Sequence, residues 1–276
     1  MSYENSVSDH YTHGNLLEAI EAALPALGKT TANLTADDLA PVDEFHIGGR
    51  PATDHLMGQL GFSEQDHLLD VGCGLGGAAR HMASKYKNFV TGIDLTLEYI
   101  ETGQALCRWL GLEKLVTLKQ GSALDMPFSD QAFGGAYMLH VGMNIADKRA
   151  LFAEVYRVLK PGSSFGVYDV MRQNTGEMSY PVPWASTSAT CALATPEEYK
   201  ESLQGAGFVI SEESSRGDFA LEFFDQLRQK TKAKGGPPPL SLHTLMQAST
   251  AEKIKNMVGN LTNGCIAPVE IIAQKK

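Results

Sequence analysis

The amino-acid sequence predicts an α/β protein with a mostly parallel β-sheet and helices on both of its faces. Short apolar runs alternate with amphipathic segments through residues 56–215, and this alternation is typical of helices that connect parallel strands. A glycine-rich turn joins the apolar run at 68–71 to a helical segment that begins near residue 76. The next apolar run, at 89–94, ends in Asp94. Because ligands of such sheets bind at the carboxyl ends of the strands, the turn and the acid are expected to lie together at a site.

The pattern of apolar residues sets the expected bounds of each element. We expect strands at residues 68–71, 89–94, 115–119, 133–140, 164–170, 208–214 and 268–273. We expect connecting helices at residues 76–86, 97–110, 147–159 and 196–205. Residues 1–55 are predicted to form an N-terminal helical cap, in which an amphipathic helix over 16–24 stops near Pro25. Residues 56–276 are expected to form the main domain.

Composition argues against several classes of function. The chain has 276 residues, 43% of them hydrophobic, and a net charge of −9, which suits a domain with a sizeable core and argues against a nucleic-acid partner. No apolar run approaches the ~20 residues of a membrane span, and the polar residues 1–10 do not resemble a signal peptide. The four cysteines lack C-x-x-C spacing, which predicts reduced thiols in a cytoplasmic protein and no metal site.

The turn after the first strand carries the strongest functional signal. Gly72 and Gly74 permit backbone angles and a close ligand approach that a side chain would block. Asp70 can accept a hydrogen bond from an ammonium group, and Asp94 can accept both hydroxyls of a ribose. These residues predict a nucleoside cofactor. Since Gly72, Gly74 and Gly77 also fit the dinucleotide pattern G-x-G-x-x-G, an NAD-dependent oxidoreductase remains an alternative.

Four segments extend this signal along the chain. They are Asp70-Val71-Gly72-Cys73-Gly74, Gly92-Ile93-Asp94-Leu95, Gly121-Ser122-Ala123-Leu124-Asp125-Met126-Pro127-Phe128 and Val158-Leu159-Lys160-Pro161-Gly162. In order and spacing they resemble the motifs of class I S-adenosylmethionine-dependent methyltransferases. The most similar branch contains ubiquinone/menaquinone C-methyltransferases and sarcosine/dimethylglycine N-methyltransferases, and residues 45–49 and 143–148 favour the second group. The resemblance implies a Rossmann-like seven-stranded sheet, S-adenosyl-L-methionine as cofactor and a small-molecule substrate.

The resemblance also implies that the last two strands pair as an antiparallel hairpin. Residues 217–262 separate these strands, whereas hairpin loops usually have about 2–5 residues. Within this late insertion we expect a helix over 219–232, a stiff loop at 235–239 and a second helix over 241–258. We expect the insertion to form a helical lid over the substrate. A surface for homodimer formation is the alternative.

The cofactor site that the resemblance implies lies at the ends of the first three strands. Its residues are Asp70, Gly72, Gly74, Asp94, Leu95, Ser122 and Ala123. The family often has an acid where Ser122 stands, and that acid holds the adenine amino group. In this chain the hydroxyl of Ser122, or the backbone of Ala123, is expected to take that role.

The candidate acceptor site lies after the fourth and fifth strands. His140 follows the fourth strand, beside the expected position of the reactive methyl group, and is the candidate general base. A hydrogen-bonded structural histidine is the alternative. Tyr180 and Trp184 decorate a proline-stiffened loop and are expected to form an aromatic wall for an onium or planar substrate. The resemblance implies that Tyr11 and His46 cover the cofactor and line the acceptor pocket.

The sequence therefore predicts methyl transfer from S-adenosylmethionine to a small molecule, either an amine or a quinone- or phenol-like metabolite. The cofactor brings both the activated methyl group and the leaving group. The protein is then expected to act mainly by aligning the acceptor and excluding water. A base is needed only if the acceptor carries a proton. The remaining alternatives are a cofactor-binding regulatory protein without turnover and the NAD-dependent oxidoreductase.

Overall fold

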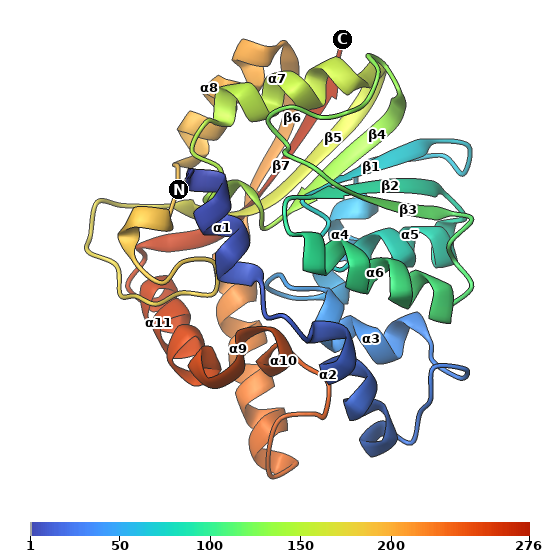
Figure 1. Cartoon of the computed structure of the whole chain (residues 1–276). Helices are drawn as coiled ribbons and strands as arrows, with labels where there is room; N and C mark the ends of the chain where they lie inside the picture. Colours follow the sequence, from blue (N-terminus) through green and yellow to red (C-terminus); the bar gives the residue numbers. More distant parts are fainter. Residues whose placement is uncertain (1) are drawn as a thin grey trace.

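Residues 2–276 are described by a computed structural model, and this part of the chain folds around a seven-stranded sheet (Figure 1). The strand order is β3-β2-β1-β4-β5-β7-β6. The strands are β1 (His67–Val71), β2 (Phe89–Asp94), β3 (Val116–Gln120), β4 (Phe133–Leu139), β5 (Leu159–Arg172), β6 (Phe208–Ser215) and β7 (Ile266–Lys275). Strands β1 to β5 are parallel, and β7 is antiparallel to both β5 and β6. The predicted fold class and the antiparallel pairing of the last two strands are confirmed.

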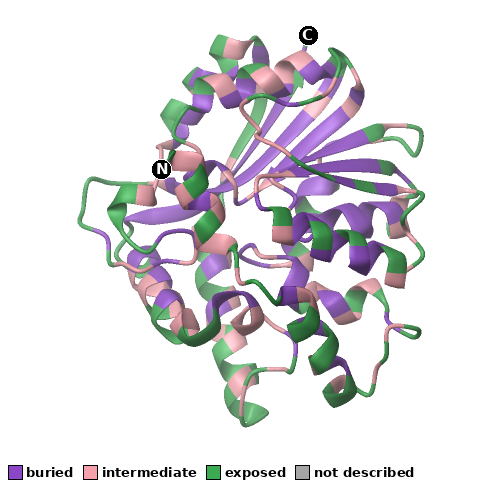
Figure 2. Ribbon diagram, in the orientation of Figure 1, coloured by how far each residue is buried: buried purple, intermediate pink, exposed green. Residues whose placement is uncertain are grey.

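Helices cover both faces of this sheet. They are α7 (Lys148–Val158) and α8 (Pro196–Ala206) on one face, and α4 (Arg50–Met57), α5 (Gly77–Tyr86) and α6 (Leu97–Trp109) on the other. The pleat of the strands explains two cores, because successive side chains point to opposite faces. In β1, Leu69 and Val71 pack in the first core, whereas Leu68 packs in the second. Figure 2 shows the result, with buried strands and helices exposed on their outer sides.

The first part of the chain is helical, as predicted. It contains α1 (Tyr3–Tyr11), α2 (Leu16–Ala23), the 3-10 helix η1 (Leu24–Leu27) and α3 (Ala36–Asp43). Helix α3 begins with a capping box, in which Thr35 and Asp38 each accept the other's backbone N–H through their side chains. Figure 1 shows α1, in dark blue, at one edge of the sheet.

The late insertion joins β6 to β7 through α9 (Gly217–Ala233), α10 (His243–Met246), the 3-10 helix η4 (Gln247–Ser249) and α11 (Thr250–Thr262). The prediction of a single helix over 241–258 is wrong. The chain breaks at Gln247, whose φ of +50° cannot continue a right-handed helix. Leu245 packs in one cluster with Leu16 and Ile20 of α2, so the insertion meets the N-terminal helices.

The other element bounds lie close to their predicted positions. Strand β5 is longer than predicted because its pairing with β7 extends from Ser164 to Arg172 and a short segment at Leu159 pairs with β4. Two further 3-10 helices, η2 (Gly142–Asn144) and η3 (Ser188–Thr190), follow β4 and β5. Among the helices of residues 2–276, none has the length and apolar character that a bilayer crossing requires.

Candidate functional site

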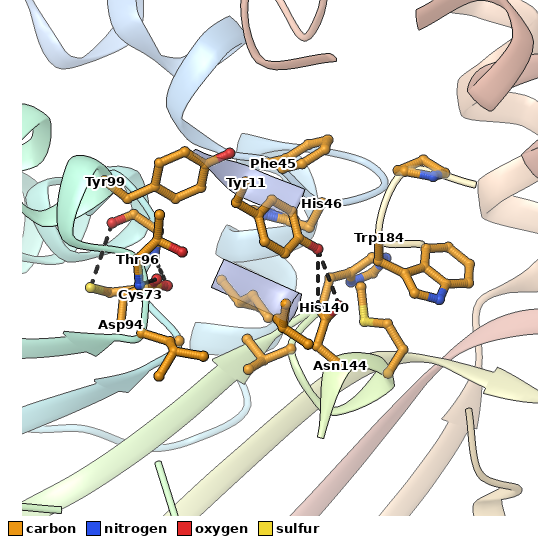
Figure 3. A pocket seen from close by; sticks show the side chains of 18 of the residues that line it. Tyr11, Phe45, His46, Cys73, Asp94, Thr96, Tyr99, His140, Asn144 and Trp184 are labelled. Atoms are coloured by element: carbon orange, nitrogen blue, oxygen red, sulfur yellow. Dashed lines mark hydrogen bonds between the residues drawn. The ribbon is translucent and has the colours of Figure 1, made fainter. Parts of the chain in front are cut away.

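A cavity of about 400 Å³ opens at the carboxyl edge of the sheet. The turns after β1, β2, β3 and β4 contribute its floor, as expected for an open α/β sheet. Helix α1, residues 42–47 and the late insertion also line it. Figure 3 shows Cys73, Asp94, Thr96 and Tyr99 at one end, His140, Asn144 and Trp184 at the other, and Tyr11 between them.

Asp94, at the end of β2, offers two carboxylate oxygens to the cavity. Oδ2 accepts the Gly74 N–H at 2.9 Å, and Oδ1 accepts the Thr96 N–H at 2.9 Å. Burial raises the pKa of this carboxyl, and the two backbone bonds oppose the rise. Because a carboxylate has about four acceptor sites in all, these two backbone bonds do not use its full capacity. Asp94 can therefore accept two neighbouring hydroxyl groups, as a ribose would present.

Asp70 lies on the neighbouring strand β1 and is 2% exposed. Its Oδ2 has no hydrogen-bond partner within the described chain, although the residue lines the cavity. Burial raises the pKa of Asp70 to about 8, the nearby Tyr137 hydroxyl opposes the rise, and Asp94 and Glu44 add to it. A buried polar atom without a partner costs free energy until a donor reaches it. Asp70 thus fits a ligand that brings an ammonium group.

Glycine is required at two positions of the turn after β1, and the physical reason differs between them. Gly72 and Gly74 have φ values of +69° and +54°, which a glycine adopts without strain. A Cβ at Gly72 would lie 2.4 Å from Val141, so this glycine lets the ends of β1 and β4 approach each other. A Cβ at Gly74 would meet only Tyr99, at 3.9 Å. Gly74 therefore leaves its backbone open to a ligand in the cavity.

The other end of the cavity is built from aromatic and amide side chains. The Asn144 Nδ2 donates to the Tyr11 hydroxyl at 3.1 Å, which joins η2 to α1. Trp184 is 2% exposed, and its indole N–H donates to Cys191 Sγ at 3.2 Å. Since its one polar atom is engaged there, the indole offers carbon atoms to the cavity. This end suits an apolar or planar group.

His140 follows β4 and is held by backbone groups on both sides of its ring. Its Nδ1 donates to the Tyr168 carbonyl at 3.2 Å, and the Ile47 N–H donates to its Nε2 at 3.4 Å. We assign the proton to Nδ1 because a carbonyl only accepts. Burial, with His46 nearby, lowers the pKa of His140 well below its ordinary value. The φ of +57° is rare outside glycine. These contacts favour a structural role over that of a base.

His46 is also neutral, and its proton is placed by three acceptors. Nε2 lies 3.1 Å from the Gly49 carbonyl, 3.0 Å from Thr53 Oγ1 and 3.8 Å from Glu44 Oε2. Thr53 in turn donates to Glu44 at 2.7 Å. The proton therefore stays on Nε2, and the lone pair lies on Nδ1. Burial lowers the pKa of His46 to about 4.

Helix α1 and the late insertion cover the cavity. The Tyr3 hydroxyl donates to the Thr190 carbonyl at 3.1 Å, and His10 Nε2 donates to the Pro183 carbonyl at 2.9 Å. These bonds dock α1 against the loop after β5. The insertion contributes the apolar side chains Phe223, Phe224, Leu242, Leu245, Ile254 and Met257. Ligand access therefore depends on segments from both ends of the sequence.

The cavity brings together most of the residues that the sequence singled out. They are Asp70, Gly72, Gly74, Asp94, Leu95, Ala123, Tyr11, His46, His140 and Trp184. Ser122 and Tyr180 do not line it. The Ser122 hydroxyl donates to Glu4 instead, and Tyr180 packs at the edge of the apolar cluster that contains Trp184.

Sequence reasoning missed Glu4, Tyr99 and the apolar residues of the insertion. Tyr99 lies in the first turn of the helix that follows Asp94. The rule that ligands bind at the carboxyl ends of the strands could have indicated this position. Its hydroxyl is buried without a partner among residues 2–276. Glu4 had no comparable signal, because it lies far from every strand in the sequence.

The charges around the cavity are acidic. Among the residues of the described chain that line it there is no lysine or arginine, and both lining histidines are neutral. The lining carboxyl groups belong to Glu4, Asp43, Glu44, Asp70, Asp94 and Asp147. Asp43 and Glu44 form ion pairs with Arg80 and Arg50 behind the lining. The cavity therefore favours neutral or cationic ligands and disfavours phosphate groups.

Comparison with known proteins agrees with this geometry. A family model described as a methyltransferase domain matches residues 69–167, from β1 into β5. Residues 69–167 therefore resemble a methyltransferase domain. The resemblance that the sequence motifs indicated is confirmed.

The methyltransferase domain has relatives with different acceptors in their names. Over 117 residues the chain is 34% identical to cycloartenol-C-24-methyltransferase of Arabidopsis thaliana, which covers 42% of this chain and 35% of that protein. Over 167 residues it is 28% identical to glycine/sarcosine/dimethylglycine N-methyltransferase of Actinopolyspora halophila, with 60% and 30% covered. The matched segments thus span about a third of these relatives.

One solved structure shares the fold over almost the whole chain. It is geranyl diphosphate C-methyltransferase from Streptomyces coelicolor A3(2), in complex with Mg²⁺, geranyl diphosphate and S-adenosyl-L-homocysteine. The TM-score is 0.71 at 19% identity, and the match covers 100% of this chain and 98% of that one. The methyltransferase fold therefore includes the N-terminal helices and the late insertion.

Proposed function

We propose that the chain is an S-adenosylmethionine-dependent methyltransferase for a small, largely apolar acceptor without a phosphate group, such as an amine or a phenol- or quinone-like metabolite. One observation carries the proposal. Asp70, the glycine turn and Asp94 face the same cavity, and that cavity continues into an aromatic end where no described residue is basic.

The residues present fit the proposed cofactor part by part. The unpartnered Oδ2 of Asp70 suits the ammonium group of the methionine portion. The free acceptor sites of Asp94 suit the ribose hydroxyls. A sulfonium between these parts and the acceptor end gains attraction from aromatic rings and carboxylates. Tyr11, Tyr99 and Phe45 lie close together there, with ring centroids 5.8 Å apart for Tyr11–Tyr99 and 6.4 Å for Tyr11–Phe45.

The NAD alternative loses support at the start of α5. A dinucleotide places its pyrophosphate against the N-terminus of this helix. In this chain Asp43 packs there, and a Cβ at Gly77 would lie 2.4 Å from the Asp43 carbonyl oxygen and 2.6 Å from Oδ1. Asp43 therefore occupies space beside Gly77 that a pyrophosphate would need.

Methyl transfer in this cavity relies on alignment. The cofactor supplies the activated methyl group and its leaving group. Tyr11 and Asn144 are held by their mutual hydrogen bond, and Trp184 is held by its bond to Cys191 Sγ. These three side chains orient the acceptor, while the insertion excludes water. Such positioning can lower a barrier by up to roughly 7–11 kcal/mol.

The four cysteines carry free thiols, which supports the proposed cytoplasmic location.

Incubation with methyl-labelled S-adenosylmethionine and a panel of metabolites tests the proposal. We expect mass spectrometry to detect labelled product from uncharged or amine acceptors and not from their phosphorylated counterparts. Binding of S-adenosylmethionine without any labelled product across the panel would support the regulatory alternative. Equal binding of NAD would contradict the cofactor assignment.

His140 is tested by two substitutions that differ in backbone tolerance. We expect His140→Asn to keep turnover within about fivefold, because asparagine tolerates a positive φ and no proton transfer is lost. Removal of a general base would instead lower turnover by roughly 10²–10⁴. His140→Ala serves as the matched variant that retains strain without the side chain. A loss above about 100-fold in His140→Asn, with unchanged cofactor affinity, would assign His140 as the base.

The raised pKa of Asp70 predicts that the affinity for the cofactor depends on pH. Its pKa of about 8 keeps the free protein's carboxyl neutral below that pH. A bound ammonium group favours the ionised form, so binding releases a proton, and affinity rises with pH up to about 8, by at most about tenfold per unit. Calorimetry of S-adenosylhomocysteine binding in two buffers measures the proton count. Asp70→Asn should bind more weakly with a flat profile, and a flat wild-type profile would contradict the assignment.

We also propose that residues 217–262 act as a mobile lid, since α9, α10 and α11 contribute apolar side chains to the cavity. Hydrogen exchange in this segment should slow when S-adenosylhomocysteine and an acceptor are bound together. Constant protection, with a dimer in solution that buries the segment, would favour the interface alternative.

A further inference from the structure

Glu4 lies at the end of the cavity next to β3, a site residue to which no role has been given. Its Oε1 accepts the Ser122 hydroxyl, although 118 positions separate the two residues. Ser122 Oγ also accepts the Leu124 N–H at 3.0 Å. The Ser122 side chain is therefore committed to protein groups. Glu4 lines the cavity, and no hydrogen bond or ion pair of residues 2–276 engages its Oε2.

The strand order places the parts of the proposed cofactor along the edge of the sheet. Strands β1, β2 and β3 are neighbours in that order. Asp70 on β1 suits the amino-acid portion, and Asp94 on β2 suits the ribose. The nucleobase, attached to the ribose on the side away from Asp70, then extends to the end of β3. The base then lies beside Leu95, Ala123 and Leu124, which line the cavity at this end.

A purine in this position leaves polar atoms that need partners. The side chains of Leu95, Ala123, Leu124 and Val7 suit the faces of a flat ring and offer no acceptor. The nearby Ser2 hydroxyl already accepts the Asn5 N–H, and the Tyr3 hydroxyl donates to Thr190. An amino group desolvated there without an acceptor would cost free energy. Among the described lining residues at this end, Glu4 carries the carboxylate, and a hydrogen bond to a carboxylate is stronger than one to the Ser2 or Tyr3 hydroxyl.

We propose that Glu4 Oε2 accepts an N–H of the adenine amino group, so that helix α1 selects adenine over a base with a carbonyl at the same ring position. The inference rests on the proposed function, since it presupposes an adenine nucleoside in the cavity. A carbonyl oxygen there would face a carboxylate oxygen and be repelled. Helix α1 would thus bind the base through Glu4 near its start. Its last residue, Tyr11, would contact the acceptor end of the cavity.

Binding of two nucleosides tests this role without reliance on turnover. Calorimetry compares S-adenosylhomocysteine with S-inosylhomocysteine, which carries a carbonyl in place of the amino group. We expect Glu4→Ala to weaken the first ligand by roughly 10- to 100-fold, the range for a hydrogen bond to a charged group. Affinity for S-inosylhomocysteine should stay the same or rise, because Glu4→Ala removes the carboxylate that repels its carbonyl oxygen. Asp9→Ala, on the same helix but at an exposed position, is the control and should alter neither affinity.

A rescue separates recognition from a structural role. Ser122→Asp, introduced together with Glu4→Ala, returns a carboxylate to the same end of the cavity. The ratio of affinities for S-adenosylhomocysteine over S-inosylhomocysteine should then recover by at least about tenfold. Equal weakening of both ligands by Glu4→Ala, or unchanged preference, would overturn the proposal. Unligated Glu4→Ala should unfold at the wild-type temperature. A wild-type protein that binds neither nucleoside would instead overturn the proposed function.

Discussion

Replacement of Asp94 by alanine is expected to weaken S-adenosylhomocysteine binding by roughly 10- to 100-fold or more, equivalent to about 1.4–2.7 kcal/mol. The substitution removes both acceptors for the ribose hydroxyls. It also frees the Gly74 and Thr96 N–H groups, which Asp94 holds at 2.9 Å. The glycine turn then loses its anchor to β2, so the cofactor loses direct contacts and a preorganised loop together.

Asp94→Asn separates these two contributions, because its amide oxygen can keep one backbone bond. We expect its affinity to lie between those of wild type and Asp94→Ala. The exposed Asp125→Ala is the matched control and should bind as wild type does. Calorimetry provides the dissociation constants of the wild type and the three variants. Wild-type affinity in Asp94→Ala would place the ribose elsewhere.

Replacement of Arg80 by methionine is expected to destabilise the fold by about 3–5 kcal/mol, as when one partner of a buried ion pair is removed. Arg80 is fully buried and donates from Nη2 to Asp43 Oδ2. Its Nη1 donates to the Leu75 carbonyl at 2.7 Å and to the Gly103 carbonyl at 3.3 Å. The guanidinium therefore ties α3, the glycine turn and α6 together.

Urea unfolding measures this effect as a change in the free energy of unfolding. The exposed Arg108→Met on α6 is the control and should lie within about 0.5 kcal/mol of wild type. The double variant Arg80→Met with Asp43→Leu should recover part of the loss, because it leaves no unpaired buried charge. A loss below about 1 kcal/mol in Arg80→Met would show that Asp43 finds another partner or a proton.

Local sequence patterns predicted the fold and the part of the site that lies at the ends of the strands. The strands from β1 to β4 could be placed because each is a short apolar run followed by a turn. Asp70 and Asp94 followed from the strand-end rule, since parallel order brings those ends to one edge. The break at Gln247 escaped prediction because no proline or glycine marks it. Its positive φ is a consequence of how the insertion closes against α2.

Contacts between distant segments explain the rest of the site. Nothing near Glu4 in the sequence connects it with Ser122, and the hydrogen bond between them depends on where α1 docks. His140 illustrates a different limit. Its place after β4 was predictable, but the Tyr168 and Ile47 backbone groups that engage its ring come from β5 and from the segment after α3. A residue's chemistry in this chain depends on the neighbours that tertiary packing supplies.

No lysine or arginine among residues 2–276 lines the cavity, and this affects the release of product. A sulfonium carries a positive charge that disappears from sulfur when its methyl group leaves. Carboxylates and aromatic rings attract the charged form more strongly than the neutral thioether that remains. Under the proposed function, the lining that attracts the methyl donor therefore binds the demethylated product more weakly. Exchange of one for the other is then favoured by electrostatics alone.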